Sequence, residues 1–115
     1  VNGTNATFVL DTGAGSTVME EKKESKFNLT TSLSESKAVG AGGNNLALKE
    51  TSIKNFCIKN YVLHDYKIHL MNLDHVNNAF KKVGIAEIDG VIGADILISG
   101  KAVIDYEKLI LYLKK

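Results

Sequence analysis

The chain has 115 residues, of which 44% are hydrophobic and 23% charged; these values are typical of a globular protein, so residues 1–115 are treated as a single domain. A formal net charge of +1 gives no electrostatic reason to bind nucleic acid or an anionic membrane, and no apolar run approaches the ~20 residues of a membrane-spanning helix. The single cysteine excludes an internal disulfide.

The first ten residues are predicted to be the second arm of a β-hairpin. Asn2-Gly3 is a strong hairpin turn signal, and the run Phe-Val-Leu at 8–10 suits a buried strand. We therefore expect a first strand, and any targeting segment, to precede residue 1.

Asp11 follows this strand and opens a turn of small residues. Residues 12–16, Thr-Gly-Ala-Gly-Ser, have so little side-chain bulk that backbone or ligand can approach closely. A carboxylate can act as a general acid or base, and here it stands beside a Thr hydroxyl and the amide N–H groups of the turn. The alternative is an ordinary turn in which Asp11 bonds to its own backbone.

The next segment contains a charged run and a glycine-rich run. Residues 17–19 predict a short strand, and residues 20–26, EEKKESK, predict a solvated loop or helical turn. Residues 39–45, VGAGGNN, are too permissive to form a rigid element. They form either a plain hairpin tip or a mobile lid whose amides reach across an extended peptide.

Strands and two helices are predicted for the rest of the chain. Alternating apolar residues between 46 and 70 predict further strands of a sheet. Asp74 as N-cap, apolar residues at helical spacing and Gly84 predict a helix over 75–83. The remaining predicted elements are a strand over 88–92, a short helix over 94–98 that Gly100 ends, and a terminal hairpin over 102–113.

These motifs, in this order, resemble the retropepsin-like aspartic proteases. The catalytic loop of that family has the sequence Asp-Thr/Ser-Gly-Ala/Ser after an apolar strand, which Asp11-Thr12-Gly13-Ala14 matches. Two apolar residues and a glycine follow in the family before a short helix, as Val91-Ile92-Gly93 do here, and residues 39–45 lie where the family has its flap. The resemblance implies an all-β retropepsin-like acid protease barrel lobe with a short C-terminal helix, and we interpret 75–83 as an inserted helix.

The activity that the resemblance implies is that of an aspartic endopeptidase, in which two carboxylates share a proton and activate water. This chain has one Asp-Thr-Gly, so the resemblance implies a homodimer in which each copy supplies catalytic Asp11. It also implies a polypeptide substrate and no cofactor. Thr12 and Gly13 are the expected supports of the catalytic loop, and the expected substrate-binding residues are Ala14, Gly15, Ala41, Gly42 and Gly43.

Two other functions stay open from the sequence: a catalytically silent peptide-binding or dimerisation module, and a lobe that pairs with another domain of a longer parent chain. A metal site is not favoured, because the spacing of His64, His69 and His75 matches no standard ligand pattern. Cys57 is predicted to be a buried apolar residue. The absence of Arg beside abundant Lys and Asn favours a bacterium with an AT-rich genome, and for localisation the periplasm or cell envelope is favoured.

Overall fold

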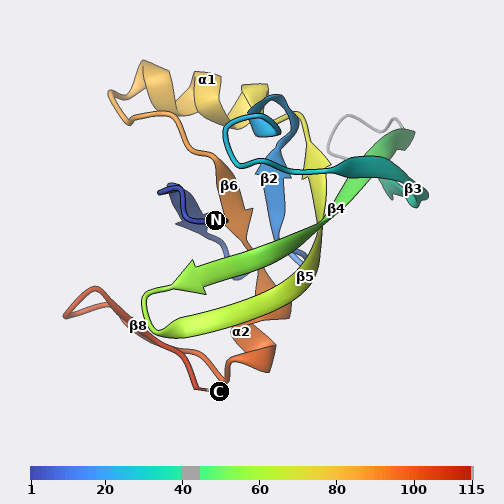
Figure 1. The fold of residues 1–115 in the computed structure, drawn as a ribbon. Coiled ribbons are helices and arrows are strands. Elements are labelled where there is room, and N and C mark those ends of the chain that lie inside the picture. The colour runs from blue at the N-terminus through green and yellow to red at the C-terminus, as the bar shows by residue number, and fades with distance from the viewer. Residues whose placement is uncertain (40–44, 115) are drawn as a thin grey trace.

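A six-stranded sheet in the order β1-β6-β2-β5-β4-β3 and a separate two-stranded sheet of β7 and β8 make up the strands of the protein in a computed structural model (Figure 1). The structure describes residues 1–39 and 45–114, and the side chains of these except at 33–39 and 45–48. The strands are β1 (Phe8–Leu10), β2 (Val18–Glu20), β3 (Thr31–Val39), β4 (Asn45–Ile58), β5 (Tyr61–Met71), β6 (Gly90–Ile92), β7 (Val103–Asp105) and β8 (Ile110–Tyr112); the helices are η1 (Glu21–Lys23), α1 (Asp74–Lys82) and α2 (Ala94–Ser99).

The middle of the large sheet brings together segments that lie far apart in the sequence. β1 pairs in parallel with β6, with Leu10 opposite Ile92. β2 pairs antiparallel with the same strand, with Val18 opposite Val91. β6 therefore lies between the strand that leads into residues 11–17 and the strand that leaves them. This arrangement holds residues 11–17 at the end of β6, where α2 begins.

A long hairpin of β4 and β5 extends the sheet on the other side (Figure 1). β5 joins the sheet by pairing in parallel with β2, with Val18 opposite His69. β3 pairs antiparallel with β4 as far as Val39 opposite Asn45. Residues 40–44, which include most of the predicted lid tip, lie outside the described residues.

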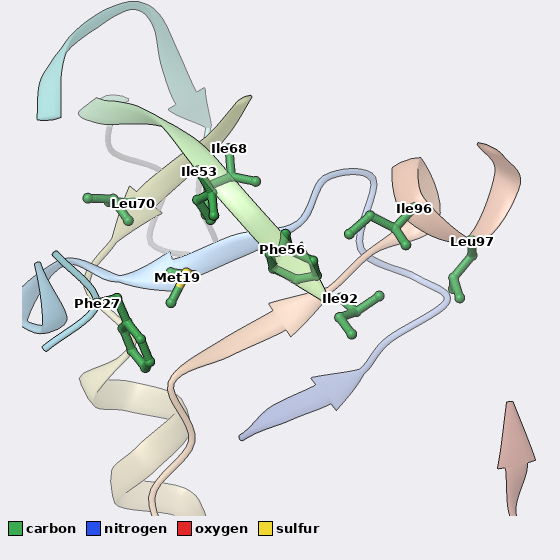
Figure 2. Close-up of a cluster of buried hydrophobic side chains, with 9 residues drawn as sticks. All are labelled: Met19, Phe27, Ile53, Phe56, Ile68, Leu70, Ile92, Ile96 and Leu97. Carbon is green, nitrogen blue, oxygen red and sulfur yellow. The ribbon is translucent and has the colours of Figure 1, made fainter. Parts of the chain in front are cut away.

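The core consists of apolar side chains that lie between the β4–β5 hairpin and strands β2 and β6 (Figure 2). Strand alternation directs Ile53 of β4 and Ile68 and Leu70 of β5 to this face. The alternation in β4 breaks at the exposed pair Lys54 and Asn55, so that Phe56 also points inward. The rings of Phe8 and Phe56 meet edge to face with their centroids 5.4 Å apart, a favoured arrangement for aromatic pairs. The buried cluster contains Met19, Phe27, Ile53, Phe56, Ile68, Leu70, Ile92, Ile96 and Leu97.

The predicted all-β fold class is confirmed. The described part of the chain adds two α-helices to the strands, and its sheets do not close into a barrel. α1 begins and ends one residue earlier than predicted, and Gly84 adopts the left-handed conformation (φ +76°) directly after the C-cap. The predicted strand over 88–92 is shorter, Gly90–Ile92. The short helix and the terminal hairpin are found as predicted, with a turn between β7 and β8.

Two predictions about single side chains are wrong. Asp74 does not cap α1 but is its first residue, and its carboxylate binds Lys22 Nζ at 2.8 Å. Asn72 Oδ1 instead accepts the Asp74 N–H at 2.7 Å. Cys57 is exposed, because Phe56 takes the inward position and adjacent residues of a strand point to opposite faces.

Glu20 is also misplaced by the sequence prediction, which put it in a solvated run. β2 continues through Glu20, which pairs opposite Met71, and its side chain is only 2% exposed. Its Oε2 accepts the Leu73 N–H at 2.5 Å, just before α1 begins. Its Oε1 has no hydrogen-bond partner among the described residues. The helical-turn prediction does hold for the residues that follow, which form η1.

No helix within residues 1–39 and 45–114 is long and apolar enough to cross a membrane.

Glu20→Ala is expected to lower the free energy of unfolding by about 2 kcal/mol, because the buried Leu73 N–H then loses its acceptor. Glu20→Gln keeps an oxygen that can accept this N–H, so its loss is expected to be smaller. Urea unfolding of the two variants beside the parent protein measures both. Equal losses in Ala and Gln variants would contradict the assignment of Glu20 as the acceptor that anchors Leu73.

Candidate active site

The Asp11 loop, residues 11–17, is built by hydrogen bonds to its own backbone and to the end of β6. The Asp11 N–H donates to the Ile92 carbonyl at 3.0 Å, and the Ala14 N–H donates to the Asp11 carbonyl at 3.2 Å. The Gly13 N–H donates to Asp11 Oδ1 at 2.9 Å, which orients the carboxylate. Asp11 itself is exposed. The loop thus presents an oriented carboxylate to solvent, although this bond is also the one that an ordinary aspartate turn would make.

Gly93 packs against the Asp11 loop backbone to backbone. The next residue, Ala94, donates its N–H to the Ala14 carbonyl at 2.7 Å. A Cβ on Gly93 would lie 2.7 Å from the carbonyl carbon and oxygen of Ser16 and 2.8 Å from the carbonyl oxygen of Ala14. The two sequence motifs therefore meet in space, and only a residue without a side chain fits where they meet.

Behind the loop, Thr17, Asp95 and Tyr66 form a hydrogen-bond network. Thr17 is 1% exposed, and its N–H and hydroxyl donate to Asp95 Oδ1 at 3.0 and 2.7 Å. The Tyr66 hydroxyl donates to Asp95 Oδ2 at 2.9 Å. The Gly93 N–H donates to Thr17 Oγ1 at 3.1 Å. The network thus joins Tyr66 of β5 and Asp95 of α2 to Thr17, at the end of the Asp11 loop, and to Gly93, at the end of the second motif.

The network shifts the pKa values of its two ionisable members in opposite directions. Partial burial of Asp95 opposes its charged form, but the hydrogen bonds from Thr17, Tyr66 and the Ile96 backbone outweigh burial and lower the pKa of Asp95. Partial burial and the hydrogen bond to Asp95 raise the pKa of Tyr66. Asp95 is therefore the charged acceptor of the network, and Tyr66 stays a donor over the physiological pH range.

An open pocket of about 380 Å³ adjoins the exposed end of the loop. It is lined by residues 10–12 on one side and by residues 104–106 and 109–111 of the β7–β8 hairpin on the other. Several large apolar side chains of this hairpin are exposed, including Tyr106 at 78% and Leu109 at 86%. We call the exposed residues Val103, Tyr106, Leu109, Ile110 and Tyr112 the apolar hairpin surface.

Five of the sequence-predicted site residues lie together in the Asp11 loop. Thr12, Gly13 and Gly15 are exposed in the Asp11 loop beside Asp11, and Ala14 is half-buried against α2. Ala41, Gly42 and Gly43 lie outside the described residues. In the described part of the chain, no group of three or more His, Cys, Asp or Glu side chains is arranged to hold a metal ion.

Sequence reasoning missed the three residues of the network behind the loop. Thr17 was predicted only as part of a strand, and Asp95 only as part of the short helix over 94–98. The position of Asp95 two residues after Gly93 is a signal that could have linked it to the second motif. Tyr66 has no local signal, because only the pairing of β5 with β2 brings it to Asp95.

Gly93→Ala is expected to lower the free energy of unfolding by about 3 kcal/mol, because the new methyl group meets backbone atoms that cannot move aside cheaply. Gly15→Ala is the matched control, since a Cβ there meets nothing within 4 Å. Thermal unfolding of both variants measures the difference. A Gly93→Ala protein as stable as Gly15→Ala would refute the close contact.

Asp95→Asn is expected to change how stability depends on pH. A carboxyl with a lowered folded-state pKa stabilises the fold above its ordinary value of about 3.9, and this contribution is lost as pH falls through the lowered pKa. The parent protein should therefore exceed Asp95→Asn in stability most at neutral pH, and the gap should narrow toward about pH 2. Urea unfolding across this range measures the gap, and a gap independent of pH would contradict a stabilised Asp95 charge.

Comparison with known proteins identifies the family. The model of the aspartyl protease family matches residues 1–96, a stretch that contains the Asp11 loop, Gly93 and Asp95. No curated protein and no solved structure matches the chain. The match confirms the resemblance to the retropepsin-like aspartic proteases that the two motifs indicate. The chain belongs to the aspartyl protease family.

Proposed function

We propose that the chain is an aspartic endopeptidase whose two-aspartate dyad forms at a homodimer interface, with Asp11 supplied by each copy. The observation that carries the proposal is the placement of Asp11. Its carboxylate is oriented by the Gly13 N–H, its loop is clamped by Gly93 and Ala94, and its side chain is still exposed. A rigidly held, exposed acid beside a pocket is what a hydrolytic dyad needs from each of its halves.

Peptide hydrolysis by this route requires two carboxyl groups in different protonation states. The ionised one takes a proton from the attacking water, and the protonated one donates to the carbonyl oxygen of the scissile peptide bond. Two carboxylates ~3 Å apart repel by roughly 5 kcal/mol at an effective dielectric near 20, so the pair retains one proton between them. One Asp11 cannot supply both roles at once, which is the chemical reason for a second copy.

The surface around Asp11 supports self-association. Tyr106, Leu109 and Ile110 of the apolar hairpin surface line the pocket that Asp11 also lines. Leu10, on the loop side of this pocket, is also exposed. Adjoining exposed apolar residues of this size are typical of interaction sites. A two-fold axis close to Asp11 would cover this surface and bring the two carboxylates together.

The remaining predicted site residues have roles that suit this arrangement. Gly13 orients the Asp11 carboxylate, and the exposed Thr12 is proposed to bond across the dimer interface. Ala14 and Gly15 leave room for an extended peptide backbone to approach. Ala41, Gly42 and Gly43, which lie between β3 and β4 in the sequence, are proposed to close over the peptide.

Asp105 offers a different pairing within one chain, because it lines the same pocket as Asp11. Its Oδ1, however, accepts the Lys108 N–H at 3.0 Å within the hairpin turn. Asp105, unlike Asp11, is followed by large side chains and not by a loop of small residues, so a second Asp11 is the proposed other half of the dyad. Asp105→Asn therefore serves as the control for the experiment that follows.

Asp11→Asn is expected to abolish cleavage of peptides without loss of fold, because the amide is nearly isosteric but cannot take a proton from water. The parent protein should cleave peptides below neutral pH with a bell-shaped pH profile, since one carboxyl must be ionised and the other protonated. A mixture of equal parts parent and Asp11→Asn protein, left to exchange subunits, is compared with the parent protein at the same total concentration. The mixture should keep about a quarter of that activity if each dimer needs two Asp11 residues.

Each other outcome of this experiment rejects part of the proposal. Half of the activity in the mixture, or loss of activity in Asp105→Asn, would replace the shared dyad by one within a single chain. A parent protein that binds peptide as a dimer but never cleaves it would be a silent binding module. Activity that arises only when another part of a parent chain is added would identify that part as the second lobe.

A further inference from the structure

Tyr66 lies on β5, outside both sequence motifs, yet its hydroxyl reaches the network behind the Asp11 loop. It donates to Asp95 Oδ2 at 2.9 Å, whereas Asp95 Oδ1 accepts both donors of Thr17. We propose that Tyr66 is a positioning residue for Asp11 and acts through Asp95 and Thr17. This inference rests on the proposed function, in which Asp11 is catalytic, and deepens it by naming a residue that controls that site from a distance.

The Asp11 loop is fixed at its start, in its middle and at its end. The start is held by the Asp11 N–H on the Ile92 carbonyl, and the middle by the Ala94 N–H on the Ala14 carbonyl. The end is held at Thr17, whose two donors both go to Asp95. The orientation of Asp95 therefore sets where the loop ends.

A movement of Asp95 would reach the loop by two routes. Thr17 would follow directly, since its N–H and hydroxyl share one oxygen of Asp95. Gly93 would follow because its N–H donates to Thr17 Oγ1 at 3.1 Å, and Gly93 in turn touches the backbone of Ser16 and Ala14. Both routes end in the short stretch of backbone that presents Asp11.

Tyr66 is suited to hold Asp95 because the core holds its ring. The ring centroid lies 6.4 Å from that of Phe56, which packs in turn against Phe8 of β1. Phenylalanine at position 66 would keep these ring contacts and remove only the hydroxyl. The side chain of Asp95, which is only partly buried, would then lose the donor that fixes its second oxygen.

The expected effect of Tyr66→Phe is a roughly ten-fold fall in kcat, since displacement of a reacting group by about 1 Å can cost up to ~100-fold and this change loosens the loop without removing it. KM should stay within about two-fold of the parent value, because Tyr66 is not one of the residues proposed to bind peptide. The matched control is Tyr61→Phe, which removes a hydroxyl from the same strand at a residue that packs on the core. This control should leave kcat unchanged.

Backbone amide exchange provides a measurement that does not depend on activity. In Tyr66→Phe the amides of Thr17 and Gly93 should exchange at least about ten-fold faster, while amides of the β4–β5 ladder keep the parent rates. Tyr61→Phe should keep the parent rates at both places. A local loss of protection with an intact ladder separates positioning of the loop from general destabilisation.

Variants of Thr17 test whether the effect passes through Asp95, and they keep the proposal testable should Tyr66→Phe fold poorly. Thr17→Val removes the hydroxyl and should lower kcat, whereas Thr17→Ser keeps the hydroxyl and should retain most of the activity. In the Tyr66→Phe, Thr17→Val double variant, kcat should be little lower than in the less active of the two single variants, because both changes act on the same carboxylate.

Three results would overturn the proposal: parent kcat and parent exchange at Thr17 in Tyr66→Phe, equal acceleration of all amides, or effects of the two single variants that multiply in the double variant. Failure of the proposed function is a separate result. If the parent protein cleaves no peptide, Asp11 is not catalytic, and the exchange rates at Thr17 and Gly93 still decide whether Tyr66 holds the loop.

Discussion

The contact between Gly93 and the Asp11 loop is the constraint on which the rest of the site depends. Two backbone segments that are 76 positions apart in the sequence are joined here by the Gly93 N–H and Thr17 Oγ1. Their closeness requires a residue without a side chain on one side and small residues on the other. The order β1-β6-β2 follows from the same requirement, because β6 must run between the two strands that flank the loop. A reactive carboxylate at the surface is in this way supported by the centre of the sheet.

Three buried or half-buried carboxylates have a common structural role. Asp89 Oδ2 accepts the Thr7 N–H at 2.8 Å, directly before β1, and Asp95 accepts the Thr17 N–H, directly before β2. Glu20 accepts the Leu73 N–H, directly before α1. In each case the N–H directly before the element is not satisfied by strand or helix bonds, and an acid from a distant segment accepts it. Strands of three residues, such as β1 and β2, have few ladder bonds of their own, so these acids fix where they begin.

The sequence predicts those parts of the structure that depend on local chemistry. The small residues after Asp11, the glycine that ends α1 and the alternation along β5 favour their conformations locally, and the structure contains each of these elements, with α1 shifted by one residue. The side chains of Glu20, Cys57 and Tyr66 could not be placed in this way. Their environments are set by which strand pairs beside them: Glu20 is buried because β2 continues one residue further, and Tyr66 meets Asp95 because β5 adjoins β2. Such contacts have no signature within a short window of residues.

The pairing of β1 with β6 has a consequence for how the protein folds. The hydrogen bonds that frame the Asp11 loop join residues 82 and 78 positions apart, whereas β4 and β5 are joined by a turn of two residues and can pair early. Closing the longer loops costs conformational entropy before their contacts can form. Residues 89–95 must therefore join the sheet before Asp11 takes up its final position. The Gly13 N–H can orient the carboxylate within the loop from the start, whereas the place of that carboxylate on the surface of the fold is set only by the long-range contacts.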